Sequence, residues 1–342
     1  MEPKNSEPSK KIRGQLFGIP TPIEKAQLIL IPAPWAVSLD HPPTVLGPET
    51  ILRTSYKIGC YQPLYPQAKK LKMAMLPIPH GWKLKSHQLS NSVKTYLQAR
   101  QAGSKIINKP LTTRVDQYTL AFKERIKNKA LMYMTQQNKM VGLLGGEQIC
   151  ALGLIQACAE QYKNFGILHI DAHPDLQKNY QGFHYTHRSL IYHTLQIPQN
   201  KSIVQLGLRD YTEEEANAIQ KNPQKITTFP YETLQQALYK GTTWHQICEE
   251  IIAKLPNKIY LSFDIDALDP KLCPTTAQPV PGGLNVNQIL YLLQHIVKAG
   301  KTIIAFDLSE VAFNGETEWD ALVASHLLHR IGILMAISQK KL

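Results

Sequence analysis

Acidic side chains and one histidine follow two short apolar runs of the chain. They are Asp171, His173 and Asp175 after residues 165–170, and Asp264 and Asp266 after residues 259–263. Alternate residues of an extended chain point the same way, so the side chains of each group can converge. Four carboxylates and an imidazole in one crevice would repel each other without a cation. We therefore predict a divalent metal site, where two ions sharing carboxylates could lower the pKa of a bridging water.

A different role for these acids has to be weighed. Aspartates at strand ends also serve as turn residues and helix caps. The second group favours the metal site, because residues 261–270, Leu-Ser-Phe-Asp-Ile-Asp-Ala-Leu-Asp-Pro, place three acids directly after an apolar strand.

Several motifs, in the same order along the chain, resemble those of the ureohydrolases, the family of arginase, agmatinase and formimidoylglutamase. The two acidic groups are similar to the family's two metal motifs. The other similar segments are residues 35–52, which end in the agmatinase-type Gly-Pro-x-x-Ile, residues 143–148, Leu-Leu-Gly-Gly-Glu-Gln, residues 205–210 and residues 307–310. The resemblance spans about residues 25–335. It implies an α/β fold, a three-layer αβα sandwich with a mainly parallel sheet, as in arginase.

The resemblance also implies roles for individual residues. The metal ligands would be Asp171, His173, Asp175, Asp264, Asp266 and Gln148, which stands where the family motif has histidine. They would hold one or two Mn²⁺ ions, although other divalent metals are possible. Asp175 would also act in catalysis, by accepting a hydrogen bond from a metal-bound hydroxide.

Two further residues are expected to act on the substrate. His187, in a polar loop, matches the family histidine that passes a proton to the leaving group, with His184 as the competing candidate in the same loop. Glu310 follows the predicted strand 302–308. Its carboxylate suits the paired N–H donors of a guanidinium, which is the contact that the family's glutamate makes. The alternatives are a solvent-exposed histidine and a capping or surface acid.

Two positions depart from the family pattern. Gln148 replaces the motif histidine, and residues 275–279, Thr-Thr-Ala-Gln-Pro, replace a Gly-Thr-Gly-Thr-Pro loop. A glutamine oxygen can bind a hard cation, but it is neutral and a weaker ligand than imidazole for manganese-type metals. One metal position is therefore expected to be weak.

The resemblance implies a metal-dependent hydrolase that cleaves a C–N bond of a guanidino compound by a metal-bound hydroxide. The segment at residues 35–52 favours the agmatinase-like branch, which releases urea. The alternative from another class is a catalytically weak or inactive homologue with a binding or regulatory role, which Gln148 and the changed loop would support. The resemblance further implies a homo-oligomer, a trimer or a hexamer.

Composition bounds the remaining possibilities. The chain has 342 residues, of which 43% are hydrophobic, enough for one large domain over residues 21–342 after a disordered tail over residues 1–20. The five cysteines lack CxxC spacing and read as reduced thiols of a cytoplasmic protein. No apolar stretch is expected to cross a membrane. The net charge of +12 comes from dispersed lysines, so a nucleic-acid partner is not expected.

Alternating strands and helices are expected to position these residues. Predicted strands are residues 27–31, 71–76, 140–144, 165–170, 203–208, 259–263 and 302–308. Predicted helices are residues 47–54, 91–101, 116–136, 150–161, 213–220, 244–254, 286–298 and 320–335. Strands separated by helices imply a parallel sheet that is covered on both faces.

Overall fold

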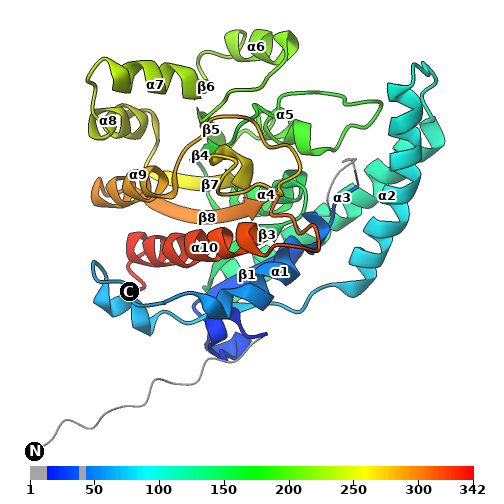
Figure 1. Ribbon diagram of the computed structural model, residues 1–342. Coiled ribbons are helices and arrows are strands. Elements are labelled where there is room, and N and C mark those ends of the chain that lie inside the picture. Colours follow the sequence, from blue (N-terminus) through cyan, green and yellow to red (C-terminus); the bar gives the residue numbers. More distant parts are fainter. Residues whose placement is uncertain (1–13, 38–43) are drawn as a thin grey trace, which may run out of the picture.

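Eight parallel strands form one sheet in the computed structural model, which describes residues 14–37 and 44–342 (Figure 1). Their order across the sheet is β2-β1-β3-β8-β7-β4-β5-β6. The strands are β1 Leu28–Ala33, β2 Met73–Met75, β3 Met140–Gly145, β4 Phe165–Ile170, β5 Asn200–Leu206, β6 Ile226–Phe229, β7 Lys258–Asp264 and β8 Thr302–Ser309. The central strands are buried along their length, as expected for a parallel sheet with both faces covered.

Helices cover both faces of this sheet, giving three layers. The described α-helices are α1 Gly47–Thr54, α2 His80–Gln101, α3 Lys109–Leu131, α4 Ala151–Gln161, α5 Leu190–Thr194, α6 Glu213–Gln220, α7 Tyr231–Tyr239, α8 Trp244–Lys254, α9 Val286–Lys298 and α10 Trp319–Ser338. Buried side chains of α1, α8, α9 and α10 share one hydrophobic core, and those of α2 to α5 share the other. The predicted αβα sandwich is therefore confirmed.

The long helices α2 and α3 form a hairpin that projects from the sheet (Figure 1). Asn108 caps the start of α3 by accepting a hydrogen bond from the Leu111 N–H, 3.1 Å away. The hairpin contacts the loop after β4, because the Tyr96 hydroxyl donates to the Gln181 carbonyl at 2.8 Å and Arg100 Nε donates to Gln181 Oε1 at 3.0 Å. The hairpin thus supports a loop next to the predicted site.

The predicted secondary structure differs from the observed one mainly in the short helices and strands. The prediction omitted β6, α5 and α7, which have four, five and nine residues. It also started α2 and α3 too late, at residues 91 and 116, because the polar first turns of both helices bury few side chains. Short elements and mostly exposed turns carry little hydrophobic periodicity, so their sequence signal is weak.

The two ends of the chain test the predicted N-terminal tail and the expectation that no segment crosses a membrane. Residues 1–13 of the predicted tail lie outside the described residues, as do residues 38–43 of the agmatinase-type segment. Leu16 and Phe17 are buried in the hydrophobic core, so packed structure begins before the predicted boundary at residue 21. At the other end, α10 is long and apolar enough to cross a membrane by composition alone, but 72% of its apolar window is buried, as in a core helix.

Candidate metal centre

The predicted site residues follow four neighbouring strands at the centre of the sheet. The strands β3, β8, β7 and β4 lie side by side, and their carboxyl ends meet at one edge, where ligands bind in open parallel sheets. One pocket at this edge is lined by Asp171, His173, Asp175, His187, Asp264, Asp266, Ala277, Gln278 and Glu310. The structure thus brings the predicted acids, both predicted histidines and Glu310 together.

Hydrogen bonds hold the first acidic group in place after β4. Asp171 Oδ1 accepts from the His173 backbone N–H at 2.6 Å, which closes a tight turn. The His173 ring turns its Nδ1 toward Asp266 Oδ2, 3.1 Å away, and toward Asp171 Oδ1, 3.5 Å away. Potential ligand atoms of Asp171, His173 and Asp266 lie within 4.8 Å of one another, close enough to share a metal ion.

The second acidic group is tied to the first. Asp264 Oδ1 accepts from the Asp266 backbone N–H at 2.9 Å, so the chain turns directly after β7. Asp266 Oδ1 accepts from the Ala172 backbone N–H at 3.2 Å. The two motifs, about ninety residues apart in sequence, therefore form one unit.

Two residues of the site have a backbone conformation that L-amino acids rarely adopt. Asp175 has φ of 56° and Glu310 has φ of 62°. The surrounding structure maintains both, since the Glu310 N–H donates to the Gly146 carbonyl at 3.0 Å and the Tyr192 N–H donates to the Asp175 carbonyl at 3.1 Å. Unfavourable backbone of this kind concentrates at functional sites, where it aims a side chain.

The buried acids create an excess of negative charge that suits a divalent cation. Burial raises the pKa of Asp175, Asp264 and Asp266, and the charges of neighbouring carboxylates raise it further. Burial opposes a charge on His173, yet Asp266 and Asp171 raise its pKa well above the usual value. Carboxylate oxygens with one imidazole are ligands for a hard or borderline ion such as Mn²⁺. The residues present therefore fit a divalent metal.

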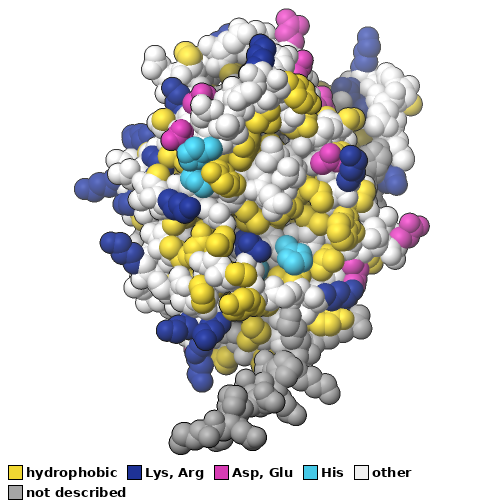
Figure 2. All heavy atoms as spheres, turned by 60° about the vertical axis from the view of Figure 1, so that its left-hand side comes forward, with side chains coloured by type: hydrophobic (Ala, Val, Ile, Leu, Met, Phe, Trp, Pro, Cys, Tyr) yellow, Lys and Arg dark blue, Asp and Glu magenta, His cyan; other side chains and the backbone are white. Residues whose placement is uncertain are grey.

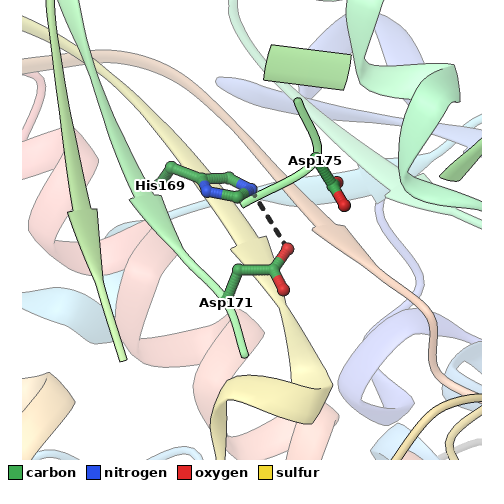
Figure 3. Close-up of side chains that lie close together, drawn as sticks. All are labelled: His169, Asp171 and Asp175. Carbon is green, nitrogen blue, oxygen red and sulfur yellow. Dashed lines mark ion pairs between the residues drawn. The ribbon is translucent and has the colours of Figure 1, made fainter. Parts of the chain in front are cut away.

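Gln148 reaches this centre through its amide nitrogen. Gln148 Nε2 donates to Asp171 Oδ2 at 2.8 Å, and the same oxygen lies 3.0 Å from His169 Nε2 (Figure 3). The Gln148 backbone N–H donates to Glu310 Oε1 at 3.0 Å. The side chain therefore supports Asp171 as a hydrogen-bond donor, while its oxygen, the atom that could bind a metal, lies 3.5 Å from His169 Nε2.

The hydrogen bonds of His169 keep that histidine from replacing the missing imidazole ligand. Gln205 Nε2 lies 2.9 Å from the Pro174 carbonyl and 3.1 Å from His169 Nδ1, so this amide donates to both. His169 Nδ1 is then an acceptor, and the ring proton sits on Nε2, which donates to Asp171. His169, Asp171 and Asp175 lie close enough for a shared ion, but this tautomer leaves His169 as a support for Asp171.

The structure separates the two candidate histidines of the polar loop. His187 is 6% exposed and lines the pocket, whereas the His184 side chain is exposed and is not among the lining residues. The Tyr180 ring meets His187 edge-on at 5.4 Å. Burial, and then the charge of Arg188, lowers the pKa of His187 well below the usual value. The imidazole is therefore neutral and a weak base, so it can carry a proton only transiently between two groups in the pocket.

The changed loop at residues 275–279 is anchored by its threonines. Thr276 Oγ1 donates to the Glu310 carbonyl at 2.9 Å, and the Thr275 backbone N–H donates to Asp320 Oδ2 at 3.0 Å. Ala277 and Gln278 then line the pocket. The loop thus keeps a wall of the site without the glycines of the family pattern.

Sequence reasoning did not identify three residues that shape the site. Gln205 orients His169, and Arg209 donates to backbone carbonyls of the loop after β7, including that of Asp266 at 2.6 Å. Arg188 contacts the pocket-lining Gln278. Gln205 and Arg209 lie in the segment at residues 205–210 that matched the family, so that motif was the available signal, whereas Arg188 had none beyond its place next to His187.

Comparison with known proteins adds an independent line of information. The model of the arginase family matches residues 26–332. N(1)-aminopropylagmatine ureohydrolase of Thermus thermophilus is 28% identical over 319 residues, which cover 92% of both chains. Agmatinase of Blochmanniella floridana is 31% identical over 202 residues, 58% of this chain and 59% of that enzyme.

Solved structures show the same fold at lower identity. The agmatine ureohydrolase of Thermoplasma volcanium superposes with a TM-score of 0.69 at 17% identity, covering 99% of this chain and 98% of that one. Arginase from Bacillus subtilis gives a TM-score of 0.65 at 20% identity over 89% of this chain and 98% of that one. At these identities the likeness concerns the fold.

Proposed function

Because the chain belongs to the arginase family, we propose that it hydrolyses a C–N bond of a guanidino compound to urea and an amine, as an agmatinase-like enzyme. The observation that carries the proposal is the convergence of five buried acids and two histidines in one pocket. The full-length match to relatives named as ureohydrolases supports it.

We propose that Asp171, His173, Asp175, Asp264 and Asp266 hold divalent metal, with Mn²⁺ as the expected ion. The metal would supply an activated water as nucleophile. Asp175 would orient that water through a carboxylate oxygen, which its unusual backbone conformation directs into the pocket.

The remaining residues would bind the substrate and move a proton. Glu310 Oε1 accepts from the Gln148 N–H, while Oε2 is buried without a hydrogen-bond partner and is free to accept from a guanidinium N–H. The neutral His187 imidazole would accept a proton from the nucleophile and pass it to the leaving nitrogen. Both side chains line the same pocket as the acids.

Gln148 is the weakest of the proposed ligands. To present its oxygen to a metal, the amide would have to turn and give up its hydrogen bond to Asp171 Oδ2. A neutral imidazole would not have to give up a hydrogen bond in this way, because one of its ring nitrogens carries a lone pair that can bind the metal directly. We therefore propose one firmly held ion and a second, weakly held ion near Gln148.

A screen of guanidino compounds tests the proposal. The purified protein, supplied with excess Mn²⁺, is assayed for urea release, and bound metal is measured by mass spectrometry. Asp264→Ala should abolish urea release and reduce bound metal, whereas Asp269→Ala, a change of the third acid in the same segment, should preserve both. Full metal content without release of urea from any compound would favour the catalytically inactive homologue with a binding role.

A further inference from the structure

Arg188 stands beside the pocket with its guanidinium held in a fixed position. It follows His187 in the short helix His187–Ser189, and its Nη2 donates to Gln278 Oε1 at 3.2 Å. The guanidinium carbon lies 5.4 Å from the centre of the Tyr180 ring, the same ring that meets His187 edge-on. Gln278 and His187 both line the pocket, and Arg188, which is not itself a lining residue, lies directly behind them through its contact with Gln278.

No carboxylate of the described residues, 14–37 and 44–342, forms an ion pair with Arg188. The buried Nε of Arg188 has no hydrogen-bond partner among them. Arg209 shows the contrast, because its nitrogens donate to carbonyls of Gly207, Asp266, Ala267, Leu268 and Val280. A half-buried guanidinium with unused donors next to a ligand pocket favours an anionic group on the ligand.

The proposed chemistry indicates where the rest of a substrate would lie. The leaving nitrogen carries the remainder of the guanidino compound, and His187 is the proposed donor of a proton to that nitrogen. Arg188 shares the Tyr180 ring with His187 and contacts the lining Gln278, and on these contacts we place it on the side on which the substrate extends away from the metal centre. Arg188 would attract a carboxylate there and repel an ammonium group.

We propose that Arg188 is a specificity-determining residue that binds a carboxylate at the far end of the substrate. Within the agmatinase-like branch, the preferred substrate class is then a guanidino compound with an anionic tail, in place of agmatine with its cationic tail. The inference rests on the proposed function, and it specifies the charge at the end of the substrate that lies away from the metal centre.

Two guanidino compounds of similar length distinguish a preference for an anionic tail from a preference for a cationic tail. 4-Guanidinobutyrate and agmatine share the guanidino end and differ in a carboxylate or an ammonium at the other. With metal-loaded wild type, we expect kcat/KM for the carboxylate compound to be higher by about 100-fold, mostly through KM, in line with a charge-assisted pair. Arg188→Met should remove most of this preference, and Arg188→Glu should reverse it. Arg114→Met, a change of an exposed arginine on α3, is the matched control and should retain the preference.

Binding measurements distinguish failure of this inference from failure of the proposed function. If no compound of the guanidino screen yields urea, the proposed function fails, and calorimetry with these two compounds still tests Arg188. Tighter binding of 4-guanidinobutyrate, lost in Arg188→Met, would support the role of Arg188. Equal binding of the two compounds, or a wild-type preference for agmatine, would overturn it, and this wild-type comparison decides even if a variant does not fold.

Discussion

Gln148 contacts both a proposed metal ligand and the proposed substrate-binding acid. Its amide nitrogen donates to Asp171, and its backbone N–H donates to Glu310, so it joins a proposed ligand to the proposed substrate-binding acid. The contact to Glu310 depends only on the backbone, whereas the contact to Asp171 depends on the amide. A change of side chain should therefore alter metal binding more than the position of Glu310.

We predict that Gln148→His strengthens the second metal position. An imidazole nitrogen is a better ligand than an amide oxygen for a borderline ion, and the loss of a supporting group costs about 10–100-fold in metal affinity. Metal titration followed by mass spectrometry should show higher occupancy in the variant, with urea release rising in parallel. An unchanged metal content would mean that residue 148 does not govern the second position. Gln205→His, a change of a buried glutamine that supports His169, is a control that should not add metal.

Glu310→Gln should weaken substrate binding and leave the metal in place. The amide keeps the shape of the carboxylate and removes the charge that would pair with a guanidinium, a loss of about 10–100-fold in kcat/KM. Steady-state kinetics and metal analysis on the same sample measure the two effects. Glu318→Gln, which changes an acid paired with Arg53 and Lys57, should retain full activity. If Glu310→Gln kept wild-type kinetics, the guanidinium would have to bind elsewhere.

At the level of elements, the ends of β3, β8, β7 and β4 position the site. Each strand is stiffened by neighbours on both sides, and hydrogen bonds hold the first residues of the loops that follow β4 and β7. Gly146 is required in the turn after β3, because a side chain there would overlap the Trp35 carbonyl oxygen. The glycine lets the chain approach residue 35 and present Gln148 to the edge of the sheet.

Asp307 in β8 should make the stability of the fold depend on pH. It is fully buried, and burial raises its pKa to about 7 from 3.8. The folded state then binds a proton that the unfolded state has lost, so stability falls as pH rises from about 4 to about 7. Asp307→Asn should remove this loss and stabilise the metal-free protein at pH 8 by up to about 4 kcal/mol, the equivalent of three pKa units.

Urea unfolding of metal-free protein at pH 5 and pH 8 checks this prediction. The variant should gain stability over wild type at pH 8 and little at pH 5. The matched control is Glu316→Gln, which changes an exposed acid near the end of the same strand and should leave the profile as in wild type. A variant that is less stable than wild type at pH 8 would mean that the Asp307 carboxylate is stabilised by its neighbours, such as the Ser309 hydroxyl 3.2 Å away.

On the scale of the whole molecule, the distribution of charge separates the surface from the site. The chain has a formal net charge of +12, yet the centre of the sheet edge collects buried acids. On the face shown in Figure 2, Lys and Arg side chains are dispersed and form no single stripe. The positive surface surrounds a negative pocket, an arrangement that suits a cationic centre inside.

Removal of metal should lower the thermal stability of the whole protein. An ion that binds only the folded state stabilises it by about 2.7 kcal/mol at a hundred times its Kd. It would also relieve the repulsion among the buried acids. Differential scanning fluorimetry with and without a chelator should show a fall of several degrees in Tm, restored by Mn²⁺. The same Mn²⁺ titration should leave Asp264→Ala unchanged, and an equal shift in that variant would place the ion elsewhere.

The fold class and the acidic groups of the candidate site could be predicted from the sequence alone. Apolar runs such as residues 165–170 and 259–263 are long enough to mark buried strands, and the acids that follow them are close in sequence, so their convergence depends only on local geometry. The ordered motifs supplied the family, which the match over residues 26–332 confirms.

The contacts between residues of different strands could not be predicted in this way, because they depend on tertiary packing. The hydrogen bond between His169 and Gln205 joins the neighbouring strands β4 and β5, and Arg188 reaches Gln278 across 90 residues of sequence. No local pattern encodes such contacts, because they depend on strand order and on the path of each loop. The place of the Gln148 amide, the tautomer of His169 and the unpaired charge of Arg188 follow from packing, which the linear order of residues does not express.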